Sequence, residues 1–215
     1  SVAVPVGEET ADRLIAALKP KVEALKVGPY TSGDDVDYGP LVTGAAKANV
    51  LRLIETGVAQ GAELVVDGRD FNLQGYEDGF FVGPHLFDRV TKDMDIYTTE
   101  IFGPVLSTVR AETYEEALAL AMDHEYGNGT AIFTRDGDTA RDFASRINIG
   151  MVGINVPIPV PLASHTFGGW KISGFGDLNQ HGPDAFRFYT RTKTVTSRWP
   201  SGLKEGGEFH FKAMD

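Results

Sequence analysis

Residues 100–105 read Glu-Ile-Phe-Gly-Pro-Val, a stretch in which a turn passes directly into a strand. The glycine and the proline favour a corner, and the isoleucine and the valine suit a core. Neither role accounts for Glu100 and Phe102. A carboxylate in this place can accept two hydrogen bonds from a sugar diol, and a nearby ring can press against a flat heterocycle. The stretch therefore predicts a corner that contacts a ligand.

On both sides of this corner, predicted strands and helices alternate from Val2 to Val156. The alternation favours an α/β fold with a largely parallel open sheet flanked by helices. Helices are expected to begin near Glu8, Thr43, Thr113 and Asp136, and Pro20 is expected to kink or divide the first of them. The predicted strands are residues 2–6, 62–66, 80–82, 105–109, 130–134 and 152–156.

Composition excludes several classes of protein. The chain has 215 residues, 42% of them hydrophobic, which is enough for a packed core. A formal net charge of −10 disfavours a general nucleic-acid binder. No apolar run reaches the roughly 18 residues that span a bilayer, so no membrane association is expected. The first residues carry no signal-peptide pattern and read like a strand already under way, so the fold is expected to be incomplete at its N-terminus.

The sequence contains no cysteine. This excludes disulfides, thiolate metal sites and a cysteine nucleophile within these residues. It fits a reducing compartment, and a cytoplasmic location is predicted.

Several familiar motifs fail on their spacing. The glycines at 168–169 lack the pattern of a phosphate-binding loop, and Gly174 and Gly176 lack the third glycine of a dinucleotide fingerprint. His124-Glu125 starts like a zinc-protease motif, but position 128 is Asn. The other histidines show no ligand spacing either, so no metal site is predicted.

Two later stretches complete a pattern. Residues 167–176 read Phe-Gly-Gly-Trp-Lys-Ile-Ser-Gly-Phe-Gly, and residues 188–198 form a Thr-rich segment with polar groups on both faces. By themselves they predict a compact loop and an extended strand that pairs with another chain. With residues 100–105, in this order and separation, they resemble the aldehyde dehydrogenase family. The resemblance runs to about Trp199, and the stretch from residue 155 onward looks most like the CoA-acylating methylmalonate-semialdehyde dehydrogenases.

The resemblance implies a reaction. In that family a nicotinamide-binding domain precedes the catalytic domain, and a cysteine thiolate attacks the aldehyde. Hydride then passes to NAD, and the thioester goes to CoA in the acylating subgroup or to water in the hydrolytic one. The nucleophile lies just before the strand with which this sequence opens. The chain is therefore expected to contain no catalytic residue and to be inactive alone.

The resemblance also assigns residues by position. Glu100 matches the carboxylate on the nicotinamide ribose, and Phe102 matches a ring that packs near the nicotinamide. Phe167 matches a residue of the aldehyde pocket, and His165 is a candidate contact to the substrate or CoA. Residues 188–198 match the strand through which subunits associate. The implied partners are a small semialdehyde, NAD, CoA and further copies of the chain.

The resulting domain prediction is an incomplete catalytic domain at 1–182, an oligomerisation strand at 183–201 and a tail at 202–215. Two alternatives stay open. The chain could be a non-catalytic assembly or binding module of the same fold, or it could belong to a hydrolytic, CoA-independent enzyme.

Overall fold

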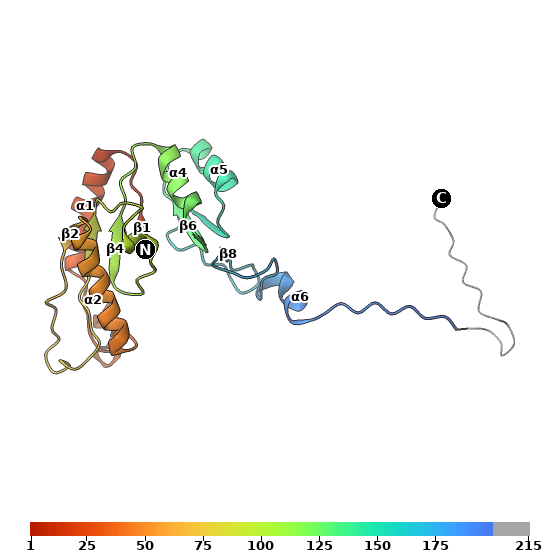
Figure 1. The fold of residues 1–215 in the computed structure, drawn as a ribbon, viewed down its shortest axis with the longest axis horizontal. Helices are drawn as coiled ribbons and strands as arrows, with labels where there is room; N and C mark the ends of the chain where they lie inside the picture. The colour runs from red at the N-terminus through yellow and green to blue at the C-terminus, as the bar shows by residue number, and fades with distance from the viewer. Residues whose placement is uncertain (200–215) are drawn as a thin grey trace. The chain divides into compact units, whose positions relative to one another are not determined.

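The computed structural model describes residues 1–199, which fall into two compact units (Figure 1). The first unit comprises residues 1–159 and 168–175. The second comprises residues 160–167 and, among the described residues, 176–199. The predicted boundaries at 182 and 201 stay predictions.

The main sheet of the first unit has four strands. Their order is β1 (Val2–Ala3), β4 (Val105–Thr108), β3 (His85–Asp88) and β2 (Glu63–Val66). The pairs β1–β4 and β4–β3 are parallel, whereas β2 joins β3 antiparallel. The prediction of an α/β fold with a largely parallel sheet is confirmed, and the antiparallel strand β2 makes the sheet mixed.

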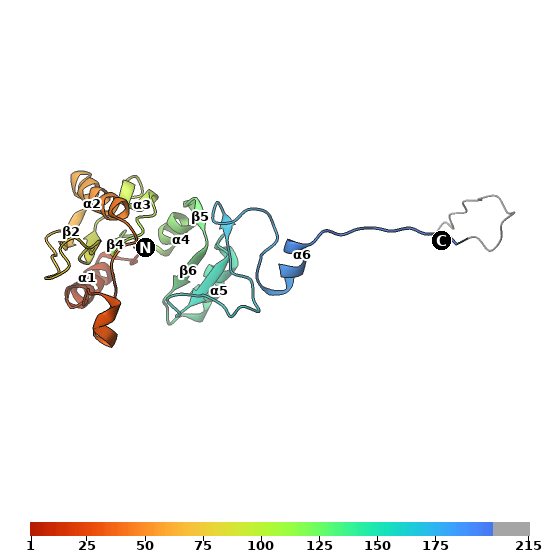
Figure 2. The same ribbon diagram turned by 90° about the horizontal axis from the view of Figure 1, so that it is seen from below.

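Helices cover both faces of this sheet. Figure 2 shows α2 (Gly44–Ala59) and the short α3 (Asp95–Thr98) on one side and α1 (Glu8–Glu23) on the other. The Thr43 hydroxyl caps α2 by accepting a hydrogen bond from a backbone N–H in its first turn. Pro20 does not divide α1, because it lies in the last turn and the helix continues to Glu23. Apolar residues of α2 and α3 pack on the strands and form the main core: Val50, Leu53, Ile54, Ile96, Phe87 and Val105.

A separate two-stranded sheet consists of the parallel pair β6 (Gly129–Ile132) and β7 (Met151–Ile154). Helices α4 (Tyr114–Asp123) and α5 (Gly137–Arg146) pack on it through a separate apolar cluster. Both predicted caps are present, since Thr113 Oγ1 accepts from Glu116 N and the Asp136 carboxylate accepts from the first turn of α5. The cluster consists of Leu118, Phe143, Ile147 and Ile149.

The remaining elements are short. Strand β5 (Tyr126–Gly127) pairs antiparallel with β8 (Trp170–Lys171), and a 3₁₀ segment spans Tyr30–Asp35. In the second unit a 3₁₀ turn at Gly182–Asp184 leads into α6 (Ala185–Tyr189). Within residues 1–199 no helix is long and apolar enough to cross a bilayer.

The predicted strand at residues 80–82 is wrong. Phe81 and Val82 are buried, but the strand lies at His85–Asp88, beyond Gly83 and Pro84. Every residue of β3 is buried because the strand lies between two others and under helices on both faces. Such a strand shows no alternation of polar and apolar residues. Its first and last residues, His85 and Asp88, are polar, so the sequence also lacks the apolar run that indicates a buried strand.

The predicted strand at 188–198 is also not present in the single chain. Phe188 and Tyr189 end helix α6, and residues 190–199 belong to no helix or strand and are exposed. A strand forms by pairing with a neighbouring strand, and among the described residues no strand pairs with this segment. The predicted tail at 202–215, with residues 200–201 before it, lies outside the described residues.

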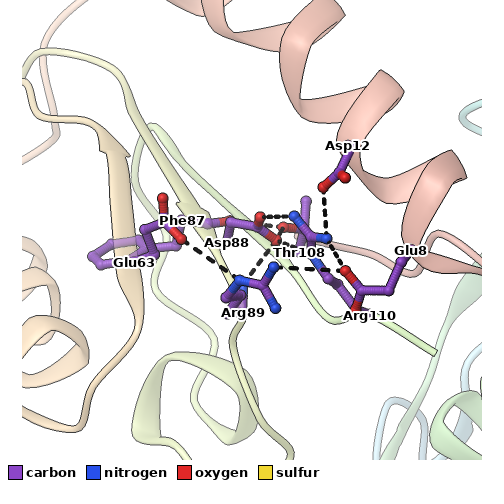
Figure 3. Close-up of polar contacts among 8 residues, drawn as sticks. All are labelled: Glu8, Asp12, Glu63, Phe87, Asp88, Arg89, Thr108 and Arg110. Atoms are coloured by element: carbon purple, nitrogen blue, oxygen red, sulfur yellow. Dashed lines mark hydrogen bonds and ion pairs between the residues drawn. The ribbon is translucent and has the colours of Figure 1, made fainter. Parts of the chain in front are cut away.

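A polar cluster joins α1 to the sheet (Figure 3). The Arg110 guanidinium donates to the Asp88 carboxylate over 2.6 Å and to Asp12 over 2.8 Å, and it also contacts Glu8. Thr108 Oγ1 donates to the same Asp88 carboxylate over 2.8 Å. Burial raises the pKa of Asp88, but the hydrogen bonds from Arg110 and Thr108 outweigh it and hold that pKa below its ordinary value.

Candidate functional site

The corner at residues 100–102 presents its polar and aromatic side chains to solvent. Ile101 is buried, whereas Glu100 is exposed and Phe102 is 77% exposed. Phe102 also has φ of 52°, a left-handed conformation that is rare for an aromatic residue. A strained, exposed phenylalanine does nothing for the core, and such strain concentrates at functional sites. The structure thus leaves both predicted residues free for a ligand.

The start of β1 lies beside this corner. Burial lowers the pKa of the Ser1 amino group, and the negative charge of Glu100 opposes that shift. Ser1 O also accepts a hydrogen bond from Ser107 N in β4, the strand that follows the corner. Glu100 and the first residue of the chain therefore lie at the same part of the sheet.

Packing beneath the corner explains its glycine and proline. A Cβ at Gly103 would lie 2.8 Å from two methyl groups of Val50 in α2, so only glycine fits without a shift. The Pro104 carbonyl accepts a hydrogen bond of 2.9 Å from the backbone N–H of His85. The corner is thereby fixed between α2 and the start of β3.

His85 is a residue that sequence reasoning missed. Its side chain is fully buried, and among the described residues neither ring nitrogen has a hydrogen-bond partner of good geometry. Its Nε2 lies 3.8 Å from Oδ1 of Asp67, whose pKa is lowered to about 2 chiefly by its hydrogen bond with Arg69. Burial lowers the pKa of His85. The backbone of Gly83 and then the negative charge of Asp67 oppose this shift, while the positive charge of Arg69 adds to it.

Stability should therefore depend on pH through His85. Because the folded-state pKa lies below the ordinary value of 6.5, the unfolded chain takes up a proton first as pH falls. The free energy of unfolding should thus decrease below pH 6.5, by at most about 1.4 kcal/mol per pH unit. Urea unfolding between pH 7.5 and pH 5.5, at about half-unit intervals, measures this slope.

A matched pair of variants assigns the slope. His85→Leu should flatten it, whereas His165→Gln should leave it unchanged because His165 is exposed. Equal slopes in the wild-type chain and in His85→Leu would rule out His85 as the source.

The glycine-rich stretch is fastened to α4 and β5. Lys171 Nζ donates to the carbonyl oxygens of Met122 over 2.7 Å and His124 over 2.8 Å, which caps the C-terminal end of α4. Ser173 Oγ accepts a hydrogen bond of 3.0 Å from Gly127 N. Lys171 itself is left-handed, with φ of 54°. The lysine and the serine of the predicted loop thus hold it in place.

The other two predicted site residues belong to the second unit. The Phe167 ring lies 5.1 Å from the His181 ring, centroid to centroid, at an interplanar angle of 45°. His165 is exposed, and its Nδ1 is 3.1 Å from Ser164 Oγ. The structure therefore places Phe167 against a histidine that the sequence had not singled out.

Two further observations delimit the site. A cavity of about 620 Å³ lies along α3 and α4, and it is lined by residues such as Tyr97, Leu120 and His124 but by none of the four predicted site residues. In the part of the chain from 1 to 199, no group of three or more His, Asp or Glu side chains is placed to hold a metal ion.

The sequence profile of the aldehyde dehydrogenase family matches residues 3–195. The chain belongs to the aldehyde dehydrogenase family. Its relatives include the malonate-semialdehyde dehydrogenase of Pseudomonas aeruginosa, which is 59% identical over 215 residues. That alignment covers 100% of this chain and 43% of the relative.

Solved aldehyde dehydrogenases share the fold. A protein assigned as methylmalonate-semialdehyde dehydrogenase from Sinorhizobium meliloti, in complex with NAD, superposes with a TM-score of 0.90 at 71% identity. The match covers 95% of this chain and 42% of that structure. The methylmalonate-semialdehyde dehydrogenase of Oceanimonas doudoroffii gives a TM-score of 0.88 at 52% identity, over 94% of this chain and 41% of that one. The chain thus spans less than half the length of these relatives.

Proposed function

We propose that this chain is the C-terminal part of the catalytic domain of an NAD-dependent, CoA-acylating semialdehyde dehydrogenase. The observation that carries the proposal is the corner at residues 100–102, where an exposed carboxylate and a strained, exposed ring adjoin the start of β1. Relatives named for malonate or methylmalonate semialdehyde make a short aldehyde with a carboxylate the best-supported substrate class.

The residues of the corner fit a nicotinamide cofactor. Within residues 1–199 no hydrogen bond occupies the Glu100 carboxylate, so both of its oxygens can accept from a ribose diol. The exposed Phe102 ring offers a flat apolar surface beside it. NAD, when bound, supplies the hydride acceptor. The task of these two residues is to orient the nicotinamide, and the chemistry needs a thiolate that these 215 residues lack. The chain alone therefore stays predicted inactive.

Glu100→Gln tests this assignment in the intact enzyme. The variant keeps the shape but loses the charge-assisted hydrogen bonds, so the KM for NAD should rise about tenfold. The KM for the aldehyde should change less than twofold, and Glu9→Gln, at an exposed position on α1, is the control. Steady-state kinetics with varied NAD measures the effect. An unchanged KM for NAD in Glu100→Gln would argue against the assignment.

The use of CoA is the finer part of the proposal. It rests on the names of the relatives and on the resemblance of the sequence from residue 155 onward to the acylating enzymes. Turnover of the complete protein with and without CoA separates the two. Equal rates under both conditions would exclude the acylating assignment.

The proposal also includes association of this chain with further copies of itself. Residues 190–198 are exposed and belong to no helix or strand, and an extended Thr-rich segment suits pairing with another copy. The same exposure is what favours the alternative of a non-catalytic assembly module. Co-purification of the chain with a full-length relative would favour that alternative, and semialdehyde turnover by the complete protein would favour the dehydrogenase. A cytoplasmic location stays a prediction.

A further inference from the structure

Two segments of the second unit meet at closely packed backbones. Gly182 N donates a hydrogen bond of 3.3 Å to the Ala163 carbonyl oxygen. Gly182 has φ of 72°, and a Cβ there would lie 3.0 Å from the carbonyl carbon of His165 and 3.1 Å from Thr166 N. The loop at 160–167 and the segment at 179–184 therefore pack as one piece, and they do so at a glycine.

His181 immediately precedes Gly182, and its backbone is fixed by a hydrogen bond of its own. Its backbone N–H donates to Oδ1 of Asn179 over 3.1 Å, which fixes a turn. The backbone is therefore fixed at residue 181 and at residue 182. The His181 ring lies 5.1 Å from the Phe167 ring, centroid to centroid, and both rings are half-buried. His165, the histidine that sequence reasoning chose, makes its side-chain hydrogen bond with Ser164.

We propose that His181 is a positioning residue for the aldehyde pocket, where it holds the ring of Phe167 in place. The proposal rests on the proposed function, which assigns Phe167 to that pocket. A tilted pair of rings at this separation stabilises one orientation of each ring beyond what burial alone provides. The imidazole thereby sets the shape of the pocket wall without touching the reacting carbon.

Loss of the imidazole should affect binding of the aldehyde and leave the chemical step alone. His181→Ala frees the Phe167 ring and opens space behind it. The KM for the semialdehyde should therefore rise about fivefold to tenfold, while kcat stays within about twofold. The KM for NAD should not change, because Glu100 and Phe102 belong to the other unit. In His181→Ala the ratio of kcat/KM for a longer unbranched aldehyde such as pentanal to kcat/KM for the semialdehyde should be higher than in the wild type.

The experiment is steady-state kinetics of the intact enzyme with four proteins: wild type, His181→Ala, His181→Phe and Gln180→Ala. His181→Phe keeps a ring against Phe167 and should return the semialdehyde KM to within about twofold of wild type. Gln180→Ala removes the exposed side chain next to His181 and should not reproduce the effect of His181→Ala. This pattern supports the proposal.

Other patterns overturn it. An unchanged semialdehyde KM in His181→Ala, or the same increase in His181→Phe, would show that no ring contact positions the pocket. A parallel loss of kcat and of NAD affinity would assign His181 a merely structural role. Wild-type turnover of the semialdehyde is read first. Its absence overturns the proposed function and this inference together, whereas an active wild type with an unresponsive His181→Ala overturns this inference alone.

Discussion

Arg110→Met is expected to lower the free energy of unfolding by about 3–5 kcal/mol. The variant keeps the length of the side chain but removes the cation that faces Asp88. The Asp88 carboxylate is 3% exposed and would be left in the sheet with hydrogen bonds from Thr108 and from the Arg89 N–H alone. A buried charge without a counter-ion is among the most destabilising features in a protein. The loss would be a large share of the 5–15 kcal/mol typical of a whole domain.

The matched control is an exposed ion pair of the same type. Arg141 pairs with Asp138 on α5, where the two side chains are 75% and 87% exposed. Arg141→Met should therefore cost no more than about 0.5 kcal/mol. Urea unfolding of both variants, followed by circular dichroism, measures the difference. Equal losses in Arg110→Met and Arg141→Met would show that burial of Asp88 adds nothing.

A second variant identifies the unpaired charge as the cause. Asp88→Asn combined with Arg110→Met removes both charges and should recover at least half of the lost stability. The pH dependence has a definite sign as well. In the wild type the pKa of Asp88 is held below 3.8, so its contribution is present above that pH and is lost as pH falls further. Without Arg110, burial raises this pKa, so the damage should be smaller at pH 4 than at pH 7.

This polar cluster also marks a limit of sequence reasoning. Helices α2, α4 and α5 could be predicted because the signals are local: an apolar stripe and a capping side chain within four residues. Arg110 lies 22 residues from Asp88 and 102 from Glu8, and no local pattern links them. Strand β3 was not predicted for a related reason: because it is buried on both faces, its sequence lacks the alternation of polar and apolar residues that indicates a strand.

The residues of the candidate site likewise fall into those that the sequence indicated and those that only the structure shows. Glu100 and Phe102 could be found because no role in the corner explains them, and the structure leaves both exposed. His181 was weighed only for metal-ligand spacing, whereas its contact with Phe167 spans 14 residues and depends on how two loops pack. His85 too was weighed only for metal-ligand spacing, and only the folded sheet shows that its ring is enclosed.

Gly168→Ala is expected to destabilise the first unit by about 2–5 kcal/mol. Two effects combine at this position. Gly168 has φ of 72°, where an alanine is strained by about 1–2 kcal/mol. Its Cβ would also lie 2.6 Å from the Asn128 carbonyl oxygen and 2.8 Å from Cγ of Met151, so the loop must move away from β6 and β7. Backbone and a buried side chain cannot yield as the tip of an exposed side chain can.

Gly75→Ala separates strain from crowding within the same unit. Gly75 is left-handed too, with φ of 82°, but nothing lies within 4 Å of a Cβ placed there. It should therefore cost about 1–2 kcal/mol, the strain alone. The two variants, unfolded in urea under identical conditions, give the cost of crowding as a difference. If Gly168→Ala were no worse than Gly75→Ala, the close approach of the loop to β6 and β7 would not be what requires a glycine after Phe167. A larger loss for Gly168→Ala would mean that crowding against Asn128 and Met151 requires a glycine there beyond the strain of its backbone.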